Sequence, residues 1–117
     1  MVTVTVRRDD RGRPASLSAT GHAGWADAGE DVVCAAVSAI LQAAWLGLEQ
    51  VAKVPVDGHK GGGNLSLRWP IEVRDSGALG TIVDTTEVSI ARIAEQYPQH
   101  VGLARETEPP LPKQGRP

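Results

Sequence analysis

The feature that most constrains the fold is an alanine-rich segment that begins at Asp31 and contains neither glycine nor proline until Gly47. Its length and its lack of helix breakers predict an α-helix of about five turns. Hydrophobic residues, among them Val33, Val37 and Leu41, are placed around most of its circumference. A helix with this pattern has to be covered by other elements, so we expect it to be the more enclosed helix of the fold.

The start of the chain predicts a β-hairpin. The first residues alternate between valine and polar side chains, which is the pattern of a half-buried strand: Val2, Thr3, Val4, Thr5, Val6 and Arg7. The segment RDDRGRP, residues 8–14, then supplies a turn, and residues 15–20 resume the extended pattern. Two antiparallel strands therefore precede the alanine-rich helix.

The second half of the chain repeats this arrangement. Residues 54–70 predict a second hairpin with a glycine-rich turn. Residues 79–97 carry an apolar stripe with helical spacing, and residues 100–108 predict a last strand. The order β-β-α-β-β-α-β predicts an α+β fold, a mainly antiparallel sheet with two helices packed on it. We expect residues 1–106 to form a single domain and residues 107–117 to form a proline-rich, disordered tail.

Composition argues against several function classes. The chain has 117 residues, with 12 lysines and arginines against 14 aspartates and glutamates, so it lacks the basic excess of a nucleic-acid-binding domain. Aromatic residues, which stack on the bases of single strands, are few. The sequence shows no signal peptide and, as we interpret it, no stretch of transmembrane length. These observations predict a cytoplasmic protein that binds neither nucleic acid nor membrane directly.

Cys34, the one cysteine of the chain, has two interpretations. On a helical projection it falls on a polar strip with Asp31, Ser38, Gln42, Trp45 and Glu49, which predicts that it faces a solvent-filled cleft. If Asp31 is the N-cap, Cys34 lies in the first helical turn, where the helix dipole favours a thiolate. The alternative is a buried residue that only packs, because free cysteine is among the most buried residue types.

His22 is the candidate partner of Cys34. It lies in the loop 21–30, whose glycines predict mobility without substrate and closure of His22 onto Cys34 when a peptide binds. Within hydrogen-bond reach, the two side chains would form a Cys-His dyad, in which the imidazole takes the thiol proton and later protonates the leaving amine.

Three further residues near Cys34 keep two interpretations each. Asp31 is either the N-cap of the helix or a carboxylate that orients His22. Ser38 donates a hydrogen bond either to substrate or to the helix backbone. Trp25 either covers a bound peptide or folds onto the core.

Metal and cofactor sites are not expected. His22, Cys34, His59 and His100 show none of the paired spacings of metal ligands. The segment GHKGGG, residues 58–63, lacks the strand-to-helix context of a phosphate-binding loop and is interpreted as a flexible hairpin with a solvated His59.

The sequence resembles a known family at its most distinctive stretch. Gly-His-Ala, then seven loop residues, then Asp-Val-Val-Cys-Ala-Ala-Val-Ser and a helix ending in Gly-Leu-Glu-Gln-Val resembles the ribosomal-processing cysteine proteases of bacteria, the Prp family. The similarity extends over residues 1 to about 106 and leaves out the tail.

This resemblance implies a cysteine endopeptidase with Cys34 as nucleophile and His22 as general base. It implies cleavage of the N-terminal extension of the twenty-seventh protein of the large ribosomal subunit, and it implies a homodimer. Gly21, Asp31 and Ser38 also match the family pattern. Two other functions remain open at this stage: a non-catalytic, ribosome-associated interaction module in which Cys34 only packs, and a thiol redox sensor that needs Cys34 but not His22.

Overall fold

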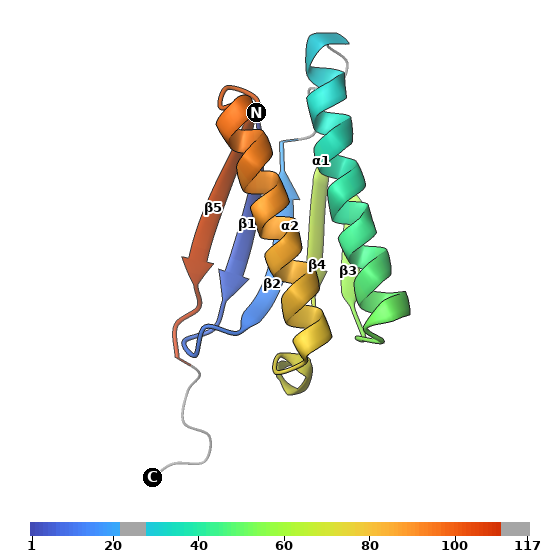
Figure 1. Cartoon of the computed structure of the whole chain (residues 1–117), viewed down its shortest axis with the longest axis vertical. Coiled ribbons are helices and arrows are strands. Elements are labelled where there is room, and N and C mark those ends of the chain that lie inside the picture. Colours follow the sequence, from blue (N-terminus) through green and yellow to red (C-terminus); the bar gives the residue numbers. More distant parts are fainter. Residues whose placement is uncertain (22–27, 111–117) are drawn as a thin grey trace.

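The computed structural model describes residues 1–21 and 28–110 of the chain, and in the second range it describes side chains from residue 32 onward. Within these residues one five-stranded sheet carries two long helices, which lie side by side over one of its faces (Figure 1). The elements, in chain order, are β1 (Val2–Arg8), β2 (Pro14–Thr20), α1 (Ala28–Leu46), β3 (Asp57–Gly61), β4 (Asn64–Arg68), α2 (Gly77–Gln96) and β5 (Val101–Thr107). A π-helical turn, Gly47–Val51, continues α1, and a short 3-10 helix, Ile71–Val73, precedes α2. The predicted order of elements is confirmed.

The sheet has the strand order β3-β4-β2-β1-β5. All neighbours are antiparallel except β1 and β5, which pair in parallel with Val4 opposite Leu103. The predicted mainly antiparallel α+β fold is therefore confirmed. β1 lies inside the sheet, and the two edges are β3, beneath α1, and β5, beside α2 (Figure 1).

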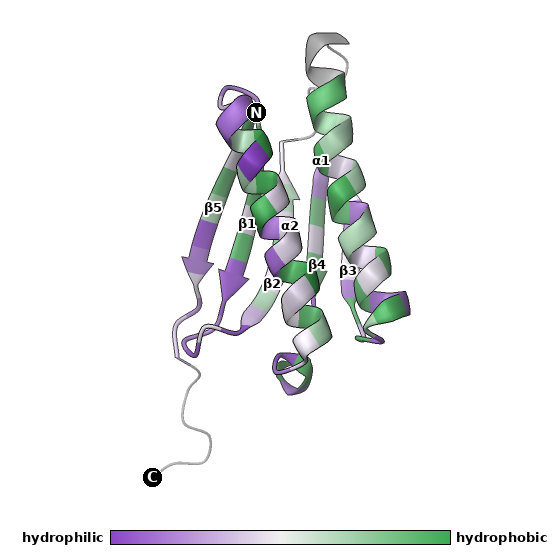
Figure 2. Ribbon diagram, in the orientation of Figure 1, coloured by the Kyte–Doolittle hydropathy of each residue, from purple (hydrophilic) through white to green (hydrophobic). Residues whose placement is uncertain are grey.

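The alternation in β1 separates the two faces of the sheet, as predicted. Val2, Val4 and Val6 are buried on the face that the helices cover. The other face carries small polar side chains: Thr5 stands opposite Ser18, and Ser18 stands opposite Ser66. Figure 2 shows the same alternation of hydropathy along the strands. The hydrophobic core thus occupies one layer, between the helices and one face of the sheet.

The start of α1 differs from the prediction. The helix begins at Ala28, three residues before Asp31, and it includes Gly29. One glycine costs a helix only about 1 kcal/mol relative to alanine, an amount that the packing of a long helix offsets. Interpreting Gly29 as a loop residue was therefore wrong, and so was the assignment of Asp31 as N-cap.

Apolar residues lie around most of the circumference of α1, but other elements do not cover all of them. One stripe of the helix and its π-helical continuation is buried, namely Val33, Val37, Leu41 and Ala44 of α1 and Leu48 of the π turn. On other sides Val32 is 74% exposed, Leu46 is 55% exposed, and Val51 in the following π turn is 78% exposed. The helical projection counted all apolar residues as core, whereas the sheet and α2 cover only part of the surface of α1.

The segment Val32–Val51 is long and apolar enough to cross a membrane by length and composition alone. The interpretation that no stretch approaches transmembrane length is therefore wrong. In the structure this segment packs its buried stripe on the sheet, and the core helices of soluble proteins meet the same criterion. The finding is thus weak evidence for a membrane span.

Helix α2 follows its predicted pattern closely. The Ser76 hydroxyl accepts a hydrogen bond from the Leu79 backbone N–H at 3.2 Å and caps the helix N-terminus. Leu79, Val83 and Ile90 of the predicted stripe are buried. Tyr97, the last residue of that stripe, lies beyond the helix and is 46% exposed.

The predicted second hairpin is formed by β3 and β4. Its turn consists of Gly62 and Gly63, which have φ angles of 60° and 79°. Two-residue turns with positive φ at both positions match the twist of antiparallel strands, and glycine adopts them without strain. The glycine-rich sequence is thus explained in part by a tight turn.

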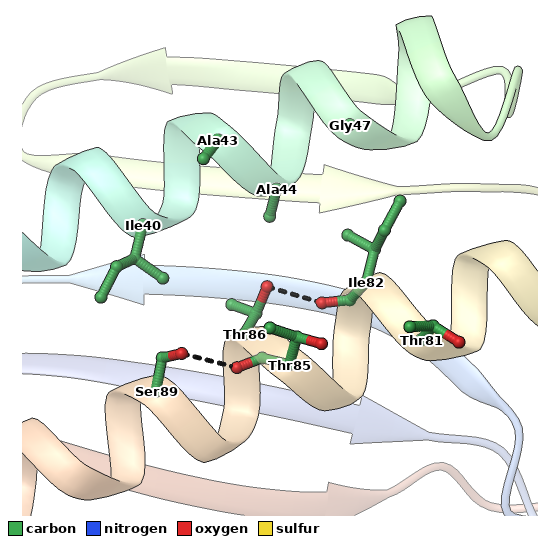
Figure 3. A pocket seen from close by; sticks show the side chains of 9 residues that line it. All are labelled: Ile40, Ala43, Ala44, Gly47, Thr81, Ile82, Thr85, Thr86 and Ser89. Atoms are coloured by element: carbon green, nitrogen blue, oxygen red, sulfur yellow. Dashed lines mark hydrogen bonds between the residues drawn. The ribbon is translucent and has the colours of Figure 1, made fainter.

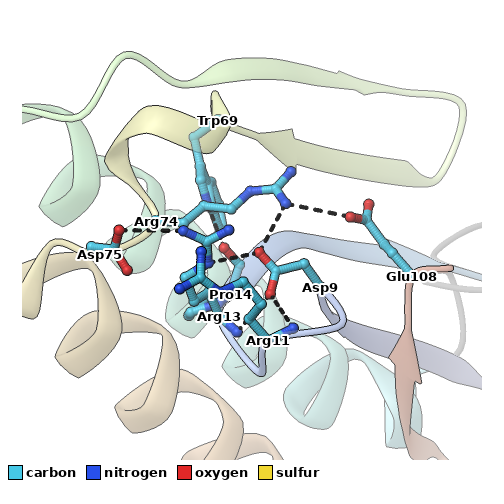
Figure 4. Close-up of polar contacts among 8 residues, drawn as sticks. All are labelled: Asp9, Arg11, Arg13, Pro14, Trp69, Arg74, Asp75 and Glu108. Atoms are coloured by element: carbon cyan, nitrogen blue, oxygen red, sulfur yellow. Dashed lines mark hydrogen bonds and ion pairs between the residues drawn. The ribbon is translucent and has the colours of Figure 1, made fainter. Parts of the chain in front are cut away.

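A buried polar cluster closes the end of the sheet at which β1 ends (Figure 4). The Asp9 carboxylate accepts hydrogen bonds from the backbone N–H groups of Arg11 and Arg13 at 2.9 and 3.0 Å. It also accepts bonds from the guanidinium groups of Arg13 and Arg74 at 3.0 and 3.2 Å. Burial alone would raise the pKa of Asp9, but these donors outweigh it and lower the pKa to about 2.

The same cluster holds the chain after β5. Arg74 lies 3.5 Å from the Glu108 carboxylate, and the Glu108 backbone N–H donates to the Arg8 carbonyl at 2.7 Å. Paired backbone therefore continues to residue 108. Of the predicted disordered tail, residues 111–117 lie outside the described part of the chain.

Candidate active site

The candidate site lies at the end of the sheet opposite the Asp9 cluster. β2 runs toward this end and leads through Gly21 to the segment before α1 (Figure 1). Gly21 has a φ of 94°, and a β-carbon at this position would overlap the Met1 carbonyl oxygen. Both the conformation and the close approach require glycine, so Gly21 fixes the direction in which the chain leaves β2.

Of the predicted site residues, His22 and Trp25 lie outside the described residues. Asp31 is described only by its backbone, which is helical. Loop closure and the distance between His22 and Cys34 concern the same segment and stay predictions.

Cys34 lies in the second turn of α1 rather than in the first. Because the helix begins at Ala28, Cys34 is its seventh residue. The unsatisfied backbone N–H groups of a helix are confined to its first four residues, so the argument that placed the sulfur among them was wrong. The remaining influence of the helix dipole falls off within the first turn.

The side chain of Cys34 is 6% exposed and belongs to the hydrophobic core cluster. The predicted orientation toward a solvent-filled cleft is therefore wrong for the described structure. The helical projection grouped Cys34 with Gln42 and Glu49, which are exposed. Cys34 also lies beside Val33 and Val37, however, and these two residues belong to the buried stripe.

Ser38, one turn after Cys34, is half-buried. Its hydroxyl accepts a hydrogen bond from the Gln42 side-chain amide at 2.8 Å. This partner is neither the helix backbone nor substrate, so the two predicted roles missed it. An accepting hydroxyl keeps its own proton available for a further acceptor.

Topology brings one additional element to this end of the molecule. The β3–β4 turn, at Gly62 and Gly63, lies at the same end of the sheet as Gly21, because β4 is antiparallel to β2 and pairs Leu65 with Ala19. Sequence reasoning interpreted this turn only as a flexible connection. His59 in β3 is solvated as predicted, with its side chain 75% exposed and its Nε2 3.1 Å from the Asp57 carboxylate.

No group of three or more histidine, cysteine, aspartate or glutamate side chains that could hold a metal ion occurs within the described residues.

A family model described as Cysteine protease Prp matches residues 1–102. The chain belongs to the Prp family of cysteine proteases. The ribosomal processing cysteine protease Prp of Staphylococcus aureus is 30% identical to it over 106 residues, which are 88% of this chain and 97% of that protein. The family membership inferred from the GHA and DVVCAAVS segments is thus confirmed, and the chain is a cysteine protease.

Solved structures support the assignment. The crystal structure of SMU.848 from Streptococcus mutans has a TM-score of 0.81 and 27% identity, over 92% of this chain and 96% of that chain. The structure of S. aureus Prp with a substrate peptide has a TM-score of 0.79 and 25% identity, over 90% of this chain and 99% of that chain. A third structure, of S. aureus Prp with a covalently linked product peptide, has a TM-score of 0.79 and 26% identity over the same shares.

Proposed function

We propose that the protein is an endopeptidase in which Cys34 is the nucleophile and His22 the general base. The observation that carries this proposal is that a member of a cysteine protease family has one cysteine in its whole sequence. That cysteine lies in α1, directly after the segment that contains His22.

The reaction requires proton transfers through His22 in both acylation and deacylation. His22 takes the proton of the Cys34 thiol, and the sulfur attacks the carbonyl carbon of the scissile peptide bond. The C–N bond then breaks, the protonated His22 gives its proton to the leaving amine, and an acyl-enzyme with an S–C bond remains. Water, deprotonated by His22, attacks this thioester and releases the acid product and the thiol.

The supporting residues have distinct roles in this proposal. Gly21 sets the path of the chain immediately before His22. The Ser38 oxygen already accepts a hydrogen bond from the Gln42 side-chain amide. The Ser38 hydroxyl proton therefore remains available, and in this proposal it is donated to substrate. Asp31 orients His22, and Trp25 covers the bound peptide.

The proposed substrate is the N-terminal extension of the twenty-seventh protein of the large ribosomal subunit. Support comes from the S. aureus relative, which is named a ribosomal processing protease and has been solved with a substrate peptide. With a ribosomal protein as substrate, we propose that the enzyme acts in the cytoplasm.

We also propose a homodimer that associates through the exposed face of the helices. Between Asp31 and Glu49 the sequence contains no charged residue, and Leu46 and Val88 contribute exposed apolar side chains from α1 and α2. Between the two helices lies an open groove of about 330 Å³ (Figure 3), whose lining residues are Ile40, Ala43, Ala44, Gly47, Thr81, Ile82, Thr85, Thr86 and Ser89.

The groove is suited to a second copy of α1. The Thr86 and Ser89 hydroxyls donate to carbonyls of their own helix at 2.7 and 2.8 Å, so they present little polarity to a partner. The stretch of α1 after Asp31 has no charged residue, so it can pack on its own symmetry mate without like charges meeting, and twofold contacts are the commonest in homo-oligomers.

The function is tested by incubating the purified protein with the host's full-length large-subunit proteins and reading the products by mass spectrometry. We expect one new N-terminus, on the twenty-seventh protein, that is absent with Cys34→Ser. Unchanged masses with the wild-type protein, or cleavage that persists in Cys34→Ser, would refute the proposal.

The dyad is tested separately by the pH dependence of Cys34 alkylation with iodoacetamide. If His22 stabilises the thiolate, Cys34 is alkylated at pH values below the ordinary thiol pKa of about 8.5, and this low-pH reactivity disappears in His22→Ala. Low-pH reactivity that persists in His22→Ala indicates a thiol redox sensor without a Cys-His dyad. Reactivity with the ordinary thiol pKa in both proteins indicates a cysteine that only packs.

A further inference from the structure

The outer strand β3 has an edge available for pairing at the active-site end of the molecule. β3 is the last strand in the sheet order, and within the described residues it pairs only with β4. Four of its five residues are exposed. An edge of this kind presents backbone N–H and C=O groups that an extended peptide can bind.

The register of the hairpin determines which backbone groups point outward. Gly61 and Asn64 flank a two-residue turn, and in such a hairpin these flanking residues form a hydrogen-bonded pair. Pairs alternate along an antiparallel ladder, so His59 also directs its backbone groups toward β4. The outward N–H and C=O groups therefore belong to Gly58 and Lys60.

This edge leads toward Cys34. Trp45 of α1 packs against Gly58 of β3, which fixes the relative height of the two elements. Cys34 is eleven residues before Trp45, about 16 Å along the helix, and Gly61 is about 10 Å beyond Gly58 along the strand. Measured along these axes, Cys34 therefore lies about 6 Å beyond Gly61, an axial offset of roughly two residues of extended peptide.

Gly61 has no conformational or steric reason to be glycine. Its φ is not positive, and a β-carbon there would meet nothing within 4 Å. Gly58 and Gly62, by contrast, must be glycine. A side chain at position 58 would overlap Trp45, and a side chain at position 62 would strain the turn. Glycine in a strand weakens it and often marks a place where another backbone approaches closely.

We propose that the outer edge of β3 binds the substrate as an added strand, through the backbone groups of Gly58 and Lys60. Gly61 lets the peptide pass close to the turn on its way to Cys34. This inference rests on the proposed peptidase function and names how the same site holds its substrate. Because the contacts are backbone to backbone, the edge positions an extended peptide of any compatible sequence, and selectivity arises closer to Cys34.

Binding is measured apart from cleavage. The protein is Cys34→Ser, and the probe is a fluorescent peptide that covers the N-terminal extension and the first mature residues of the host's twenty-seventh large-subunit protein. Lys60→Pro removes one outward N–H and leaves the bonds to β4 in place, since proline is tolerated on edge strands when its position faces solvent. Lys60→Ala measures how much the lysine side chain, as opposed to the backbone N–H, contributes to the binding affinity.

We expect Lys60→Pro to weaken binding about tenfold beyond Lys60→Ala, the effect of one lost hydrogen bond that is left without a substitute. Gly61→Val, which fits the strand, is also expected to weaken binding, by its bulk. Equal affinities for Lys60→Pro and Lys60→Ala overturn the proposal, and so does a peptide that does not bind Cys34→Ser at all.

A second measurement does not depend on whether these variants fold. A series of peptides, each N-methylated at one position, is bound to Cys34→Ser, and we expect affinity to fall at every second position across one stretch. A pattern without this alternation overturns the proposal. If alternation is found while the wild-type protein cleaves nothing, edge binding holds and the proposed peptidase activity fails.

Discussion

The indole of Trp45 lies against the backbone of Gly58, in the space that a β-carbon at that position would need. This contact joins α1 to the outermost strand of the sheet. It also explains a glycine in β3 that the turn does not require.

Gly58→Ala is therefore expected to lower the free energy of unfolding by about 1–3 kcal/mol, the usual cost of overpacking. Urea denaturation followed by tryptophan fluorescence measures this change. Gly61→Ala is the matched control, because an added methyl group meets nothing there and should leave stability equal or slightly higher. Equal losses in both variants would show that strand conformation, and not the indole, sets the cost.

Asp9 predicts how stability responds to acid. Its pKa in the folded protein is about 2, below the ordinary value of 3.8. The unfolded chain therefore takes up the proton first, and the stabilisation is complete above about pH 4 and is lost as the pH falls toward 2. We expect this single group to contribute about 2 kcal/mol at neutral pH.

Denaturation curves at pH 7 and pH 3, for the wild type and Asp9→Asn, test this expectation. The variant should be less stable at pH 7 and should lose less stability on acidification. A pH dependence that is the same in both proteins would exclude Asp9 as its source.

Glu87 connects α2 to two strands of the sheet. Its carboxylate lies 2.6 Å from Arg8 of β1 and 2.6 Å from Arg105 of β5. Burial opposes its ionisation, but the two guanidinium groups outweigh burial and lower the pKa of Glu87. We expect Glu87→Gln to cost about 1 kcal/mol at low salt and less in 1 M salt, because partly exposed ion pairs are screened. Asp84→Asn, whose more exposed carboxylate contacts Arg8 at 3.1 Å, should cost less; a larger loss there would contradict the assignment.

Gly21 predicts a catalytic effect without a change in any reacting group. In Gly21→Ala the new methyl group overlaps the Met1 carbonyl, so the chain must leave β2 in another direction and displace His22. We expect kcat/KM for the peptide substrate to fall about 100-fold, as small misplacements of reacting groups do. Gly12→Ala has similar backbone strain at a φ of 78° with open space around it, and it should keep full activity. Equal kcat/KM for the two variants would show that Gly21 does not position a catalytic residue.

The proposed dimer predicts that a charge on the helix face separates the subunits. Leu46→Glu, at a position 55% exposed, should retain the helical circular dichroism spectrum and run as a monomer in light scattering. Thr107→Glu, at the exposed end of β5, should remain dimeric. A wild-type protein that is monomeric at micromolar concentration would refute the dimer itself.

Much of the fold could be predicted because local pattern and tertiary environment agree. The alternation of Val2, Val4 and Val6 has one interpretation, and the stripe of α2 faces the sheet as its spacing requires. The exposed face of α1 could not be predicted, since an apolar residue on a projection does not say whether anything covers it. Val32 and Val33 are equally hydrophobic, yet one is 74% and the other 7% exposed.

The candidate site was predictable in identity but not in environment. Cys34 and the family were evident from the GHA and DVVCAAVS segments. The burial of the sulfur was missed because a helical projection gives the direction of a side chain but not what covers it. The position of Cys34 in the helix was missed because α1 begins before Gly29 and not after it. The outer position of β3 was also missed, since register and strand order arise only when distant segments pair.

The parallel pairing of β1 with β5 also determines when the protein can finish folding during its synthesis. β1 is made before every other strand of the sheet, yet its second neighbour is β5, residues 101–107, the last of these strands in chain order. A nascent chain still lacking these residues has Val2 and Val4 without that neighbour, and the Met1 backbone that Gly21 contacts is less firmly held. The domain therefore acquires its complete sheet only after residues 101–107 have been synthesised.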